Sequence, residues 1–144
     1  MSRPKGERVV YLNGRYVPES QAMVPFRDRG FTRGDAVYDA TRTFAHRIFR
    51  NKEHIDRLYR SLSYLQIDPG LTPVEMMQAT VEVAARNTPL LAPDADYWII
   101  QRVSRGLDAP DKAIWGQDGP TVIIECQPLP FRERAHETEA AGTR

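Results

Sequence analysis

Residues 29–65 read RGFTRGDAVYDATRTFAHRIFRNKEHIDRLYRSLSYL, and within this stretch the spacing of the apolar residues changes. Residues 36–44 are rich in β-branched and aromatic side chains, which predicts a strand that turns back at residues 45–47 into a second strand at residues 48–50. From residue 51 onward, one apolar stripe recurs at helical spacing. It consists of Ile55, Leu58, Leu62 and Leu65. The stretch therefore predicts a hairpin followed by an amphipathic helix.

Turn and capping residues indicate further elements. Asn13-Gly14 separates the short runs 9–12 and 15–17 and predicts a β-hairpin, because both turn residues tolerate positive φ. Thr72-Pro73-Val74-Glu75 is a capping box that begins a second helix, which we expect to end near Arg86. Its expected apolar side, again at helical spacing, is Val74, Met77, Val81 and Ala84.

Two later runs, residues 97–103 and 121–126, are too uniformly apolar for half-exposed strands, so we expect them inside the sheet. Residues 106–119 contain Pro110 and several glycines and predict a loop. Hairpins, two consecutive helices and later strands favour the α+β class, with two helices packed on an antiparallel sheet. We expect residues 1–131 to form one small domain and residues 132–144 to be a linker or the start of a second domain.

Composition narrows the class of protein. The formal net charge of +1 over 144 residues gives no global electrostatic reason to bind nucleic acid or an anionic membrane. The single cysteine, Cys126, cannot form an internal disulfide, and its apolar surroundings predict a buried strand thiol. His46, His54 and His136 lie too far apart to suggest a metal site. With no secretory leader and no apolar run of spanning length, the sequence predicts a cytoplasmic protein.

Arg57 is the residue of the first expected helix that is best suited to bind a ligand. It lies between Ile55 and Leu58, so its Cα is close to the buried stripe and its side chain can reach the neighbouring strands. A planar guanidinium can hold a phosphate with two hydrogen bonds. The alternative is an arginine that extends into solvent or pairs with Glu53 or Asp56.

An ordered set of short motifs extends from about Val9 to about Pro130. The set is Asn13-Gly14, Asp28-Arg29-Gly30, Gly34-Asp35, Tyr38 and HIDRL at residues 54–58. In order and spacing it resembles the enzymes of aminotransferase class IV, the group that holds the branched-chain and D-amino acid aminotransferases and aminodeoxychorismate lyase. The resemblance implies the small N-terminal domain of a fold-type-IV enzyme, in which Arg57 grips the phosphate of pyridoxal 5′-phosphate. It also implies a homodimer that moves an amino group from a small-molecule amino donor to a keto acid.

The resemblance extends to four substrate-pocket candidates. Tyr38 and Arg42 alternate toward one face of a strand that forms a pocket wall in the family. Tyr97 matches a position that borders the substrate in the branched-chain enzymes, and Arg105, like Arg102, lies near the strand end as a candidate carboxylate ligand. The alternatives are a half-buried strand aromatic for Tyr38, a structural ion pair for Arg42 and a solvent-facing guanidinium for the later arginines.

Departures from the family leave the substrate open. Ile99 stands where the branched-chain enzymes carry an arginine two residues after the tyrosine. Pro110 and Lys112 stand where the D-amino acid enzymes place an arginine and a histidine. Neither substrate specificity therefore carries over.

The family's Schiff-base lysine and its pyridine-binding glutamate lie in a second domain. Lys5, Lys52 and Lys112 are the lysines of this chain, and none stands in that lysine's context. The resemblance therefore implies no catalytic residue here and no activity of the chain alone. Two alternatives stay open: a lyase on the same scaffold that eliminates pyruvate, and a non-catalytic domain that binds a small anion or another chain.

Overall fold

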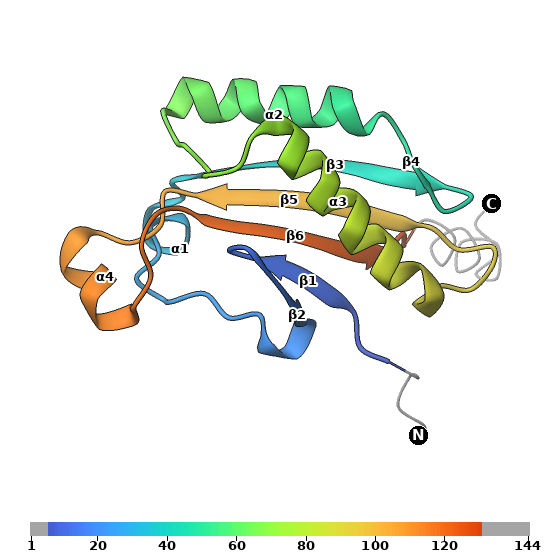
Figure 1. Ribbon diagram of the computed structural model, residues 1–144, viewed down its shortest axis with the longest axis horizontal. Coiled ribbons are helices and arrows are strands. Elements are labelled where there is room, and N and C mark those ends of the chain that lie inside the picture. Colours follow the sequence, from blue (N-terminus) through green and yellow to red (C-terminus); the bar gives the residue numbers. More distant parts are fainter. Residues whose placement is uncertain (1–5, 131–144) are drawn as a thin grey trace, which may run out of the picture.

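The computed structural model describes residues 6–130, and its strands form one six-stranded sheet (Figure 1). The strands are β1 (Val9–Leu12), β2 (Arg15–Pro18), β3 (Ala36–Phe44), β4 (Arg47–Ile48), β5 (Tyr97–Ser104) and β6 (Thr121–Pro128). Every pair is antiparallel, and the spatial order is β2-β1-β6-β5-β3-β4. The predicted linker, residues 132–144, lies outside the described residues. The predicted interior positions of the two apolar strands, β5 and β6, are confirmed.

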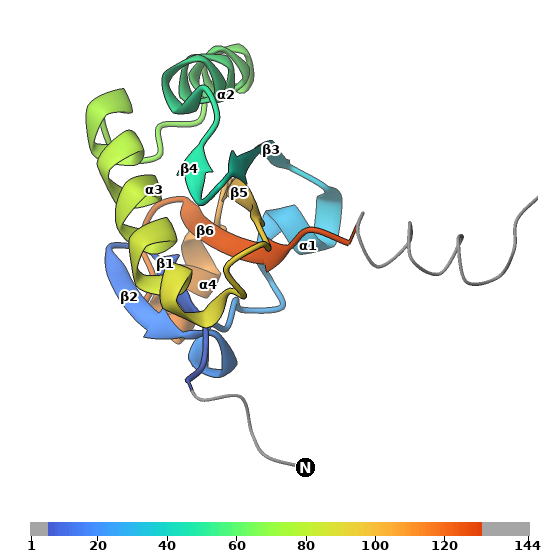
Figure 2. The ribbon, with the colours of Figure 1, turned by 90° about the vertical axis from the view of Figure 1, so that its right-hand side faces the viewer.

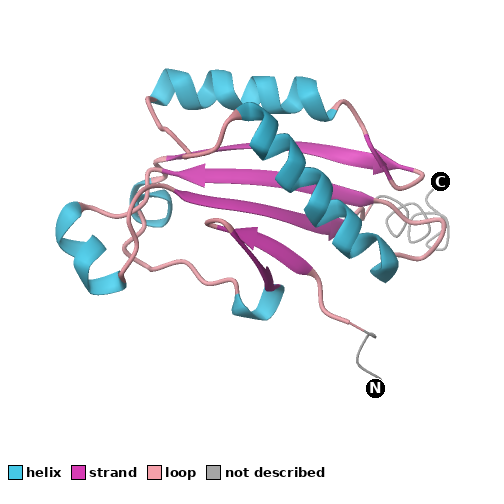
Figure 3. Ribbon diagram, in the orientation of Figure 1, coloured by secondary structure: helices cyan, strands magenta, loops and turns pink. Residues whose placement is uncertain are grey.

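The helices cover the sheet unequally. They are α1 (Arg29–Arg33), α2 (Asn51–Leu65), α3 (Pro73–Asn87) and α4 (Ala109–Trp115), with 3-10 turns η1 (Glu19–Gln21) and η2 (Thr88–Leu90). Figure 2 shows α2 and α3 together on one face, whereas α1 lies on the opposite side near one end of the sheet. Figure 3 shows α4 beside the same end. The predicted α+β class, with two helices on an antiparallel sheet, is confirmed.

The core lies between the sheet and the two long helices. Ile55, Leu58 and Leu62 of α2 are fully or almost fully buried, as the periodicity predicted. They pack with the inward-facing residues of the central strands, among them Ile99 and Cys126. The predicted burial of the cysteine is therefore confirmed. Burial raises the pKa of its thiol to about 12.

Both predicted hairpins form. Asn13 and Gly14 adopt positive φ angles of 48° and 88° in the β1–β2 turn. The β3–β4 turn places Ala45 and His46 at φ angles of 48° and 67°, and β4 ends at Ile48 rather than at residue 50. The carboxylate of Asp96 holds this turn, because it accepts hydrogen bonds from the Thr43 hydroxyl at 2.6 Å and the His46 N–H at 2.9 Å.

The capping box of α3 is present, but the predicted apolar side of that helix is only partly confirmed, because Ala84 is buried and Met77 packs against the core while the two valines do not. The Thr72 hydroxyl accepts from the Glu75 N–H, and the Glu75 carboxylate accepts from the Thr72 N–H, each at 3.2 Å. Val74 and Val81 are 60% and 52% exposed, whereas Val83 is fully buried. The second helix therefore presents a face to the sheet that differs from the apolar stripe.

The buried face of α3 combines apolar and polar residues. Thr80 and Asn87 lie on it together with apolar residues such as Met76 and Val83. The Thr80 hydroxyl donates to the Met76 carbonyl at 2.8 Å, and the Asn87 amide exchanges two hydrogen bonds with the backbone of Val9, at 2.7 and 2.8 Å. Since these polar groups have partners, their burial carries little cost, and both can belong to a largely apolar core face.

Residues 106–119 contain a helix where a loop was expected. α4 begins after Asp108, has Pro110 in its first turn and ends at Gly116, whose φ is 63°. Proline lacks an N–H that the first turn does not need, so it begins this helix rather than breaking it. Proline and glycine here delimit a short helix, and the prediction of a loop was wrong.

Candidate functional site

A buried carboxylate lies between β3 and α2 and contacts two side chains of the helix. Asp39 points from β3 toward the helices and is 4% exposed. Arg57 Nε donates to its Oδ2 at 2.6 Å, and Arg57 Nη2 donates to its Oδ1 at 3.0 Å. His54 Nδ1 lies 2.7 Å from the same Oδ1. A helical spacing of three residues places the histidine and the arginine on one side of α2, facing this strand.

The protonation states follow from the donor and acceptor inventory. An ionised carboxylate only accepts, so the proton in the contact between His54 and Asp39 is on the histidine Nδ1. The 3.3 Å approach of Arg57 Nη2 to that nitrogen is then a contact and not a hydrogen bond. Burial by itself raises the pKa of Asp39, but the hydrogen bonds from Arg57 and His54 together outweigh burial, and the pKa lies below its ordinary value. The same carboxylate raises the pKa of Arg57. Asp39 is therefore charged and holds one edge of a charged guanidinium.

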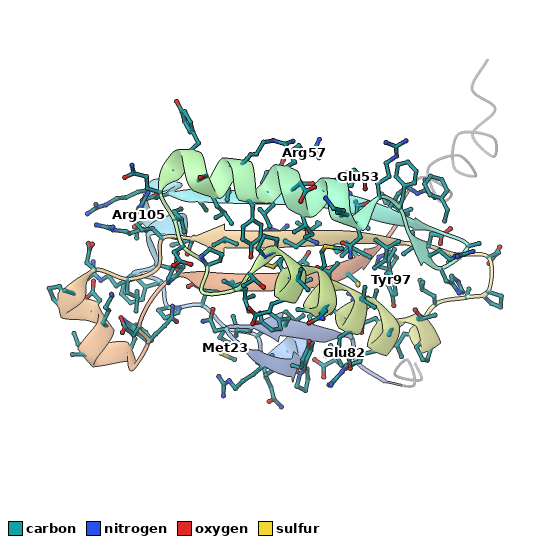
Figure 4. All side chains as sticks on the ribbon, turned by 45° about the horizontal axis from the view of Figure 1, so that its top comes forward. Met23, Glu53, Arg57, Glu82, Tyr97 and Arg105 are labelled. Atoms are coloured by element: carbon teal, nitrogen blue, oxygen red, sulfur yellow. The ribbon has the colours of Figure 1, made fainter. Side chains whose placement is uncertain are left out.

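The rest of the Arg57 guanidinium remains accessible. The arginine side chain is 58% exposed although its carboxylate partner is buried. It borders a shallow groove of about 420 Å³, which is lined by Val37, Arg57, Arg60, Ser61, Tyr64 and Leu65. Figure 4 shows Arg57 on the outer side of α2. The groove surface is mainly apolar, and the residues that border it include two arginines and two hydroxyl-bearing residues, groups that can bind an anion such as a phosphate.

The sheet edge beside this groove is open. β4 pairs only with Thr43 and Phe44 of β3, so residues 36–40 have no strand partner on that side among residues 6–130. Val37, a residue of this edge, lines the groove. Unpaired backbone groups beside an arginine-lined groove are available to a ligand or to another strand.

Tyr38 and Arg42 lie on one face of the sheet, as their spacing predicted, and this face is the one opposite α2 and α3. Tyr38 is 70% exposed and stands across from Arg102 in the β3–β5 register. Arg42 stands across from Trp98, but its guanidinium lies over the Phe44 ring, 3.9 Å from its centroid, and its Nε donates to the Thr43 carbonyl at 3.0 Å. The structure therefore brings Tyr38 and Arg42 to one face, with the arginine directed toward the hairpin end of β3.

Tyr97 is not brought to that face. It is 2% exposed, and its hydroxyl donates to the Asn87 carbonyl at 2.7 Å beneath α3. The residue of β5 that shares the face of Arg42 is Trp98, because successive strand residues point to opposite faces. Tyr97 therefore belongs to the core. Trp98 is the aromatic side chain that β5 places on the sheet face of Tyr38 and Arg42, which we call the open face.

Arg105 is also separate from the groove, and Figure 4 shows it well apart from Arg57 and Tyr97. Its Nε donates to Asp35 Oδ2 at 2.6 Å, and its Nη2 donates to the Leu65 carbonyl at 2.9 Å. Arg105 therefore ties the end of β5 to the last turn of α2 and to the turn before β3. These contacts satisfy a helix C-terminus, which favours a cation.

The lysines of the described chain have surface partners. Lys52 Nζ lies 2.7 Å from Asp56, and Lys112 Nζ lies 2.9 Å from Asp118. Hydrogen bonding to Asp56 raises the pKa of Lys52, which keeps that amine protonated. Lys5 and His136 lie outside the described residues. Within residues 6–130 no cluster of three or more His, Cys, Asp or Glu side chains is arranged to hold a metal ion, and none of the helices there has the length and apolar character needed to cross a bilayer.

Sequence reasoning missed Asp39 as the partner of Arg57. The signal was available, because Asp39 lies on the face of β3 that alternation assigns to the interior. A buried carboxylate requires a cationic or hydrogen-bonding partner, and the nearby helix supplies Arg57 and His54. The structure thus adds a fixed carboxylate to the predicted arginine.

The fold and the site together define a class of protein: an α+β domain with a shallow groove, bordered by Arg57 and Arg60, beside an open strand edge. The chain belongs to the amino-transferase class IV family, whose sequence model matches residues 36–143.

Curated relatives agree with this assignment. The chain is 42% identical over 78 residues to a putative branched-chain-amino-acid aminotransferase of Methanocaldococcus jannaschii, a match that covers 54% of this chain and 27% of the relative. It is 29% identical over 133 residues to the D-alanine aminotransferase of Staphylococcus aureus, covering 78% of this chain and 47% of the relative. The chain therefore spans less than half the length of these relatives.

Solved structures share the fold. The branched-chain aminotransferase of Thermoproteus uzoniensis, determined with norvaline, matches with a TM-score of 0.70 at 25% identity, covering 86% of this chain and 41% of that one. A T.th. branched-chain amino acid aminotransferase, complexed with N-(5'-phosphopyridoxyl)-L-glutamate, matches with a TM-score of 0.71 at 23% identity, with the same coverages of 86% and 41%. The part matched is the N-terminal part of these enzymes.

Proposed function

We propose that residues 6–130 form the phosphate-holding side and one substrate wall of a pyridoxal 5′-phosphate-dependent aminotransferase, which moves an amino group between an amino acid and a 2-keto acid. The observation that carries the proposal is the Arg57 guanidinium, fixed along one edge by Asp39 and open toward a groove. Membership of the class IV family gives this groove its proposed ligand.

The groove residues fit the cofactor phosphate. A phosphate monoester carries about 1.5 to 2 negative charges and three acceptor oxygens at neutral pH. Arg57 can donate from the nitrogens that Asp39 leaves accessible, and Ser61 adds a hydroxyl donor in the same groove. Because Asp39 holds the guanidinium before the ligand arrives, less side-chain entropy is lost on binding. When bound, pyridoxal phosphate supplies the electron sink for removal of the Cα proton of an amino acid.

The open sheet face is the proposed substrate wall. Tyr38 is its most exposed aromatic residue, and its phenol can donate to a carboxylate or to the edge of the cofactor. Trp98 is 38% exposed and adds apolar surface beside Arg42. This mixture of apolar surface and a phenol donor suits an amino acid, which has a side chain and a carboxylate of its own. Substrate contacts by Tyr97 and Arg105, as the sequence predicted, would require both side chains to leave the contacts described above.

The lysine that bonds the cofactor is proposed to lie outside residues 6–130. Lys52 and Lys112 both pair with surface carboxylates and do not line the groove. The coverage of less than half of each relative supports a second contributing segment. On this proposal, residues 6–130 alone hold the phosphate but do not transfer an amino group.

We also propose a homodimer in the cytoplasm. Support for self-association comes from apolar side chains exposed near the end of the sheet that α1 and α4 flank. They are Phe26, Phe31 and Ile114. Support for a reducing compartment comes from Cys126, a lone buried thiol that forms no disulfide. Sedimentation of the chain over a range of concentrations tests the dimer, and a monomer at all concentrations contradicts it.

The phosphate site is tested by binding of pyridoxamine 5′-phosphate, which has no aldehyde and cannot react with lysines. Pyridoxamine, which lacks only the phosphate, is the matched ligand. We expect Arg57→Ala to weaken binding of the phosphorylated ligand by about 2 kcal/mol, which is near thirtyfold, because a charge-assisted pair of hydrogen bonds is lost. Binding of pyridoxamine should not change.

Arg86→Ala is the matched control variant. Arg86 also lies on a helix and donates to a carboxylate, that of Glu82, at 2.7 Å, but it does not line the groove. Equal binding by Arg57→Ala and Arg86→Ala contradicts the proposed site. Aminotransferase activity is tested separately by its need for a keto acid acceptor, since a lyase releases pyruvate without one.

A further inference from the structure

Arg57 alone gives the groove almost no net positive charge with which to attract a phosphate. Its guanidinium is hydrogen-bonded along one edge to the ionised carboxylate of Asp39, so the pair as a whole is close to neutral. A neutral pair can donate hydrogen bonds but attracts a distant dianion weakly, because the fields of the two charges cancel beyond a few ångströms. The attraction of a phosphate therefore needs a further positive charge.

Arg60 is positioned to supply that charge. It lies three residues after Arg57 on α2, a spacing that makes the two side chains neighbours, and both line the groove. Among the ion pairs formed within residues 6–130, those on α2 join Lys52 to Asp56, His54 to Asp39 and Arg57 to Asp39, and none includes Arg60. The positive charge of Arg60 is thus not neutralised by a carboxylate partner of the described chain.

Other acidic groups of α2 do not alter this balance. Asp56 lies 2.7 Å from Lys52, so its charge is already matched. Glu53 precedes Arg60 by seven residues, which is about 10 Å along a helix axis, and does not line the groove. Arg60 therefore carries an unmatched positive charge beside the nearly neutral pair of Arg57 and Asp39.

We propose that Arg60 is a second ligand of the anion in this groove, and that it supplies the net positive charge while the pair of Arg57 and Asp39 supplies fixed hydrogen-bond donors. The ligand class is a phosphate monoester dianion, and the inference rests on the proposed function. Ser61, the next residue, adds a hydroxyl donor in the same groove. Arg57 and Arg60 thus have different roles, one geometric and one electrostatic.

The different roles predict different salt dependence. Arg60→Gln should weaken binding of pyridoxamine 5′-phosphate by about three- to tenfold at about 20 mM salt, and by less than about twofold at about 300 mM salt, because an exposed charge is screened. Arg57→Ala should weaken binding at both salt concentrations, because short hydrogen bonds are screened less. Arg60→Lys keeps the charge and should retain most of the affinity.

The measurement is an NMR titration of the full chain with pyridoxamine 5′-phosphate, pyridoxamine and inorganic phosphate at both salt concentrations. Arg86→Ala removes the same formal charge away from the groove and controls for net charge. Weakening confined to the two phosphate ligands and to low salt supports the role of Arg60. If inorganic phosphate alone responds, the groove is a general anion site and the cofactor assignment of Arg60 is overturned.

Two further outcomes separate this inference from the proposed function. If Arg57→Ala weakens binding but Arg60→Gln binds as tightly as the wild type at low salt, the role of Arg60 is wrong and the phosphate site stands. If neither substitution changes binding, the proposed function itself fails. If Arg60→Gln weakens pyridoxamine as much as its phosphate ester, Arg60 acts on the ring or on the fold, and the inference is overturned.

Discussion

Substitution of Asp39 by asparagine separates the charge of the buried carboxylate from its shape. The wild-type side chain accepts hydrogen bonds from Arg57 at 2.6 and 3.0 Å and lies 2.7 Å from His54 Nδ1. A hydrogen bond to a charged group contributes about 1.5–3 kcal/mol. Arg57 is 58% exposed and regains water when the pair is lost, so the net cost lies near the lower end of that range for the whole cluster. We expect Asp39→Asn to lower the free energy of unfolding by about 2 kcal/mol at pH 7.

The assay is urea unfolding followed by circular dichroism, with Glu82→Gln as the control. Glu82 pairs with Arg86 on the surface of α3, and an exposed pair of this kind contributes less than about 1 kcal/mol. The Arg57→Ala background is the second test. There Asp39 is left with His54 alone, so Asp39→Asn should cost about 1 kcal/mol less than in the wild type. Equal costs for Asp39→Asn and Glu82→Gln, or strict additivity with Arg57→Ala, refute the reasoning.

The pH dependence of the free energy of unfolding tests the same carboxylate. The pKa of Asp39 is lowered in the folded chain from a value of 3.8, so the folded state binds a proton less readily than the unfolded state. The stability from this carboxylate is therefore fully present above about pH 4 and is lost as the pH falls through the folded pKa. The difference in unfolding free energy between the wild type and Asp39→Asn should stay constant from pH 7 to pH 5 and shrink below about pH 4. A difference that disappears between pH 7 and pH 5 contradicts the assignment.

Three further predictions test the packing. Cys126 should react with a thiol reagent at pH 8 only as fast as the chain unfolds, because burial raises the pKa of its thiol to about 12. Rapid reaction of the folded chain would contradict the burial of this thiol. Val83→Ala should lower the free energy of unfolding by about 2 kcal/mol and Val81→Ala by less than about 0.5 kcal/mol, because only Val83 is buried. A larger loss for Val81→Ala than for Val83→Ala would contradict this burial. Thr72→Ala should cost about 1 kcal/mol by removing the cap of α3, and thermal unfolding measures the loss.

Local patterns predicted the elements that make the groove. The stripe of Ile55, Leu58 and Leu62 determines the face that α2 buries, and this face in turn places Arg57 beside β3. Helical periodicity depends on neighbours within two turns, so the sequence carries it directly. The strand of β3 follows in the same way from its β-branched and aromatic composition.

Local sequence patterns could not predict the contacts between segments that lie far apart in the chain. Whether Tyr97 or Trp98 faces Arg42 depends on the register between β3 and β5, and a shift of one residue exchanges the two faces. The role of Arg105 depends on the last turn of α2 lying within its reach, 40 residues earlier in the chain. Neither fact follows from residue type and spacing alone.

The core face of α3 illustrates a second limit. Its apolar residues do not form a single stripe, and the expected stripe includes the exposed Val74 and Val81, whereas the sheet receives the face of Met76 and Val83. That face also includes Thr80 and Asn87, whose side chains have hydrogen-bond partners. Packing against the sheet selects between the two overlapping faces, and helical spacing alone does not.

A crystal structure of the chain with pyridoxamine 5′-phosphate tests the phosphate site most directly. We expect phosphate oxygens about 2.7–3.0 Å from the Arg57 guanidinium, with Asp39 still bonded to the same side chain. Phosphate bound elsewhere, with Arg57 extended into solvent, would show that Arg57 does not hold the ligand.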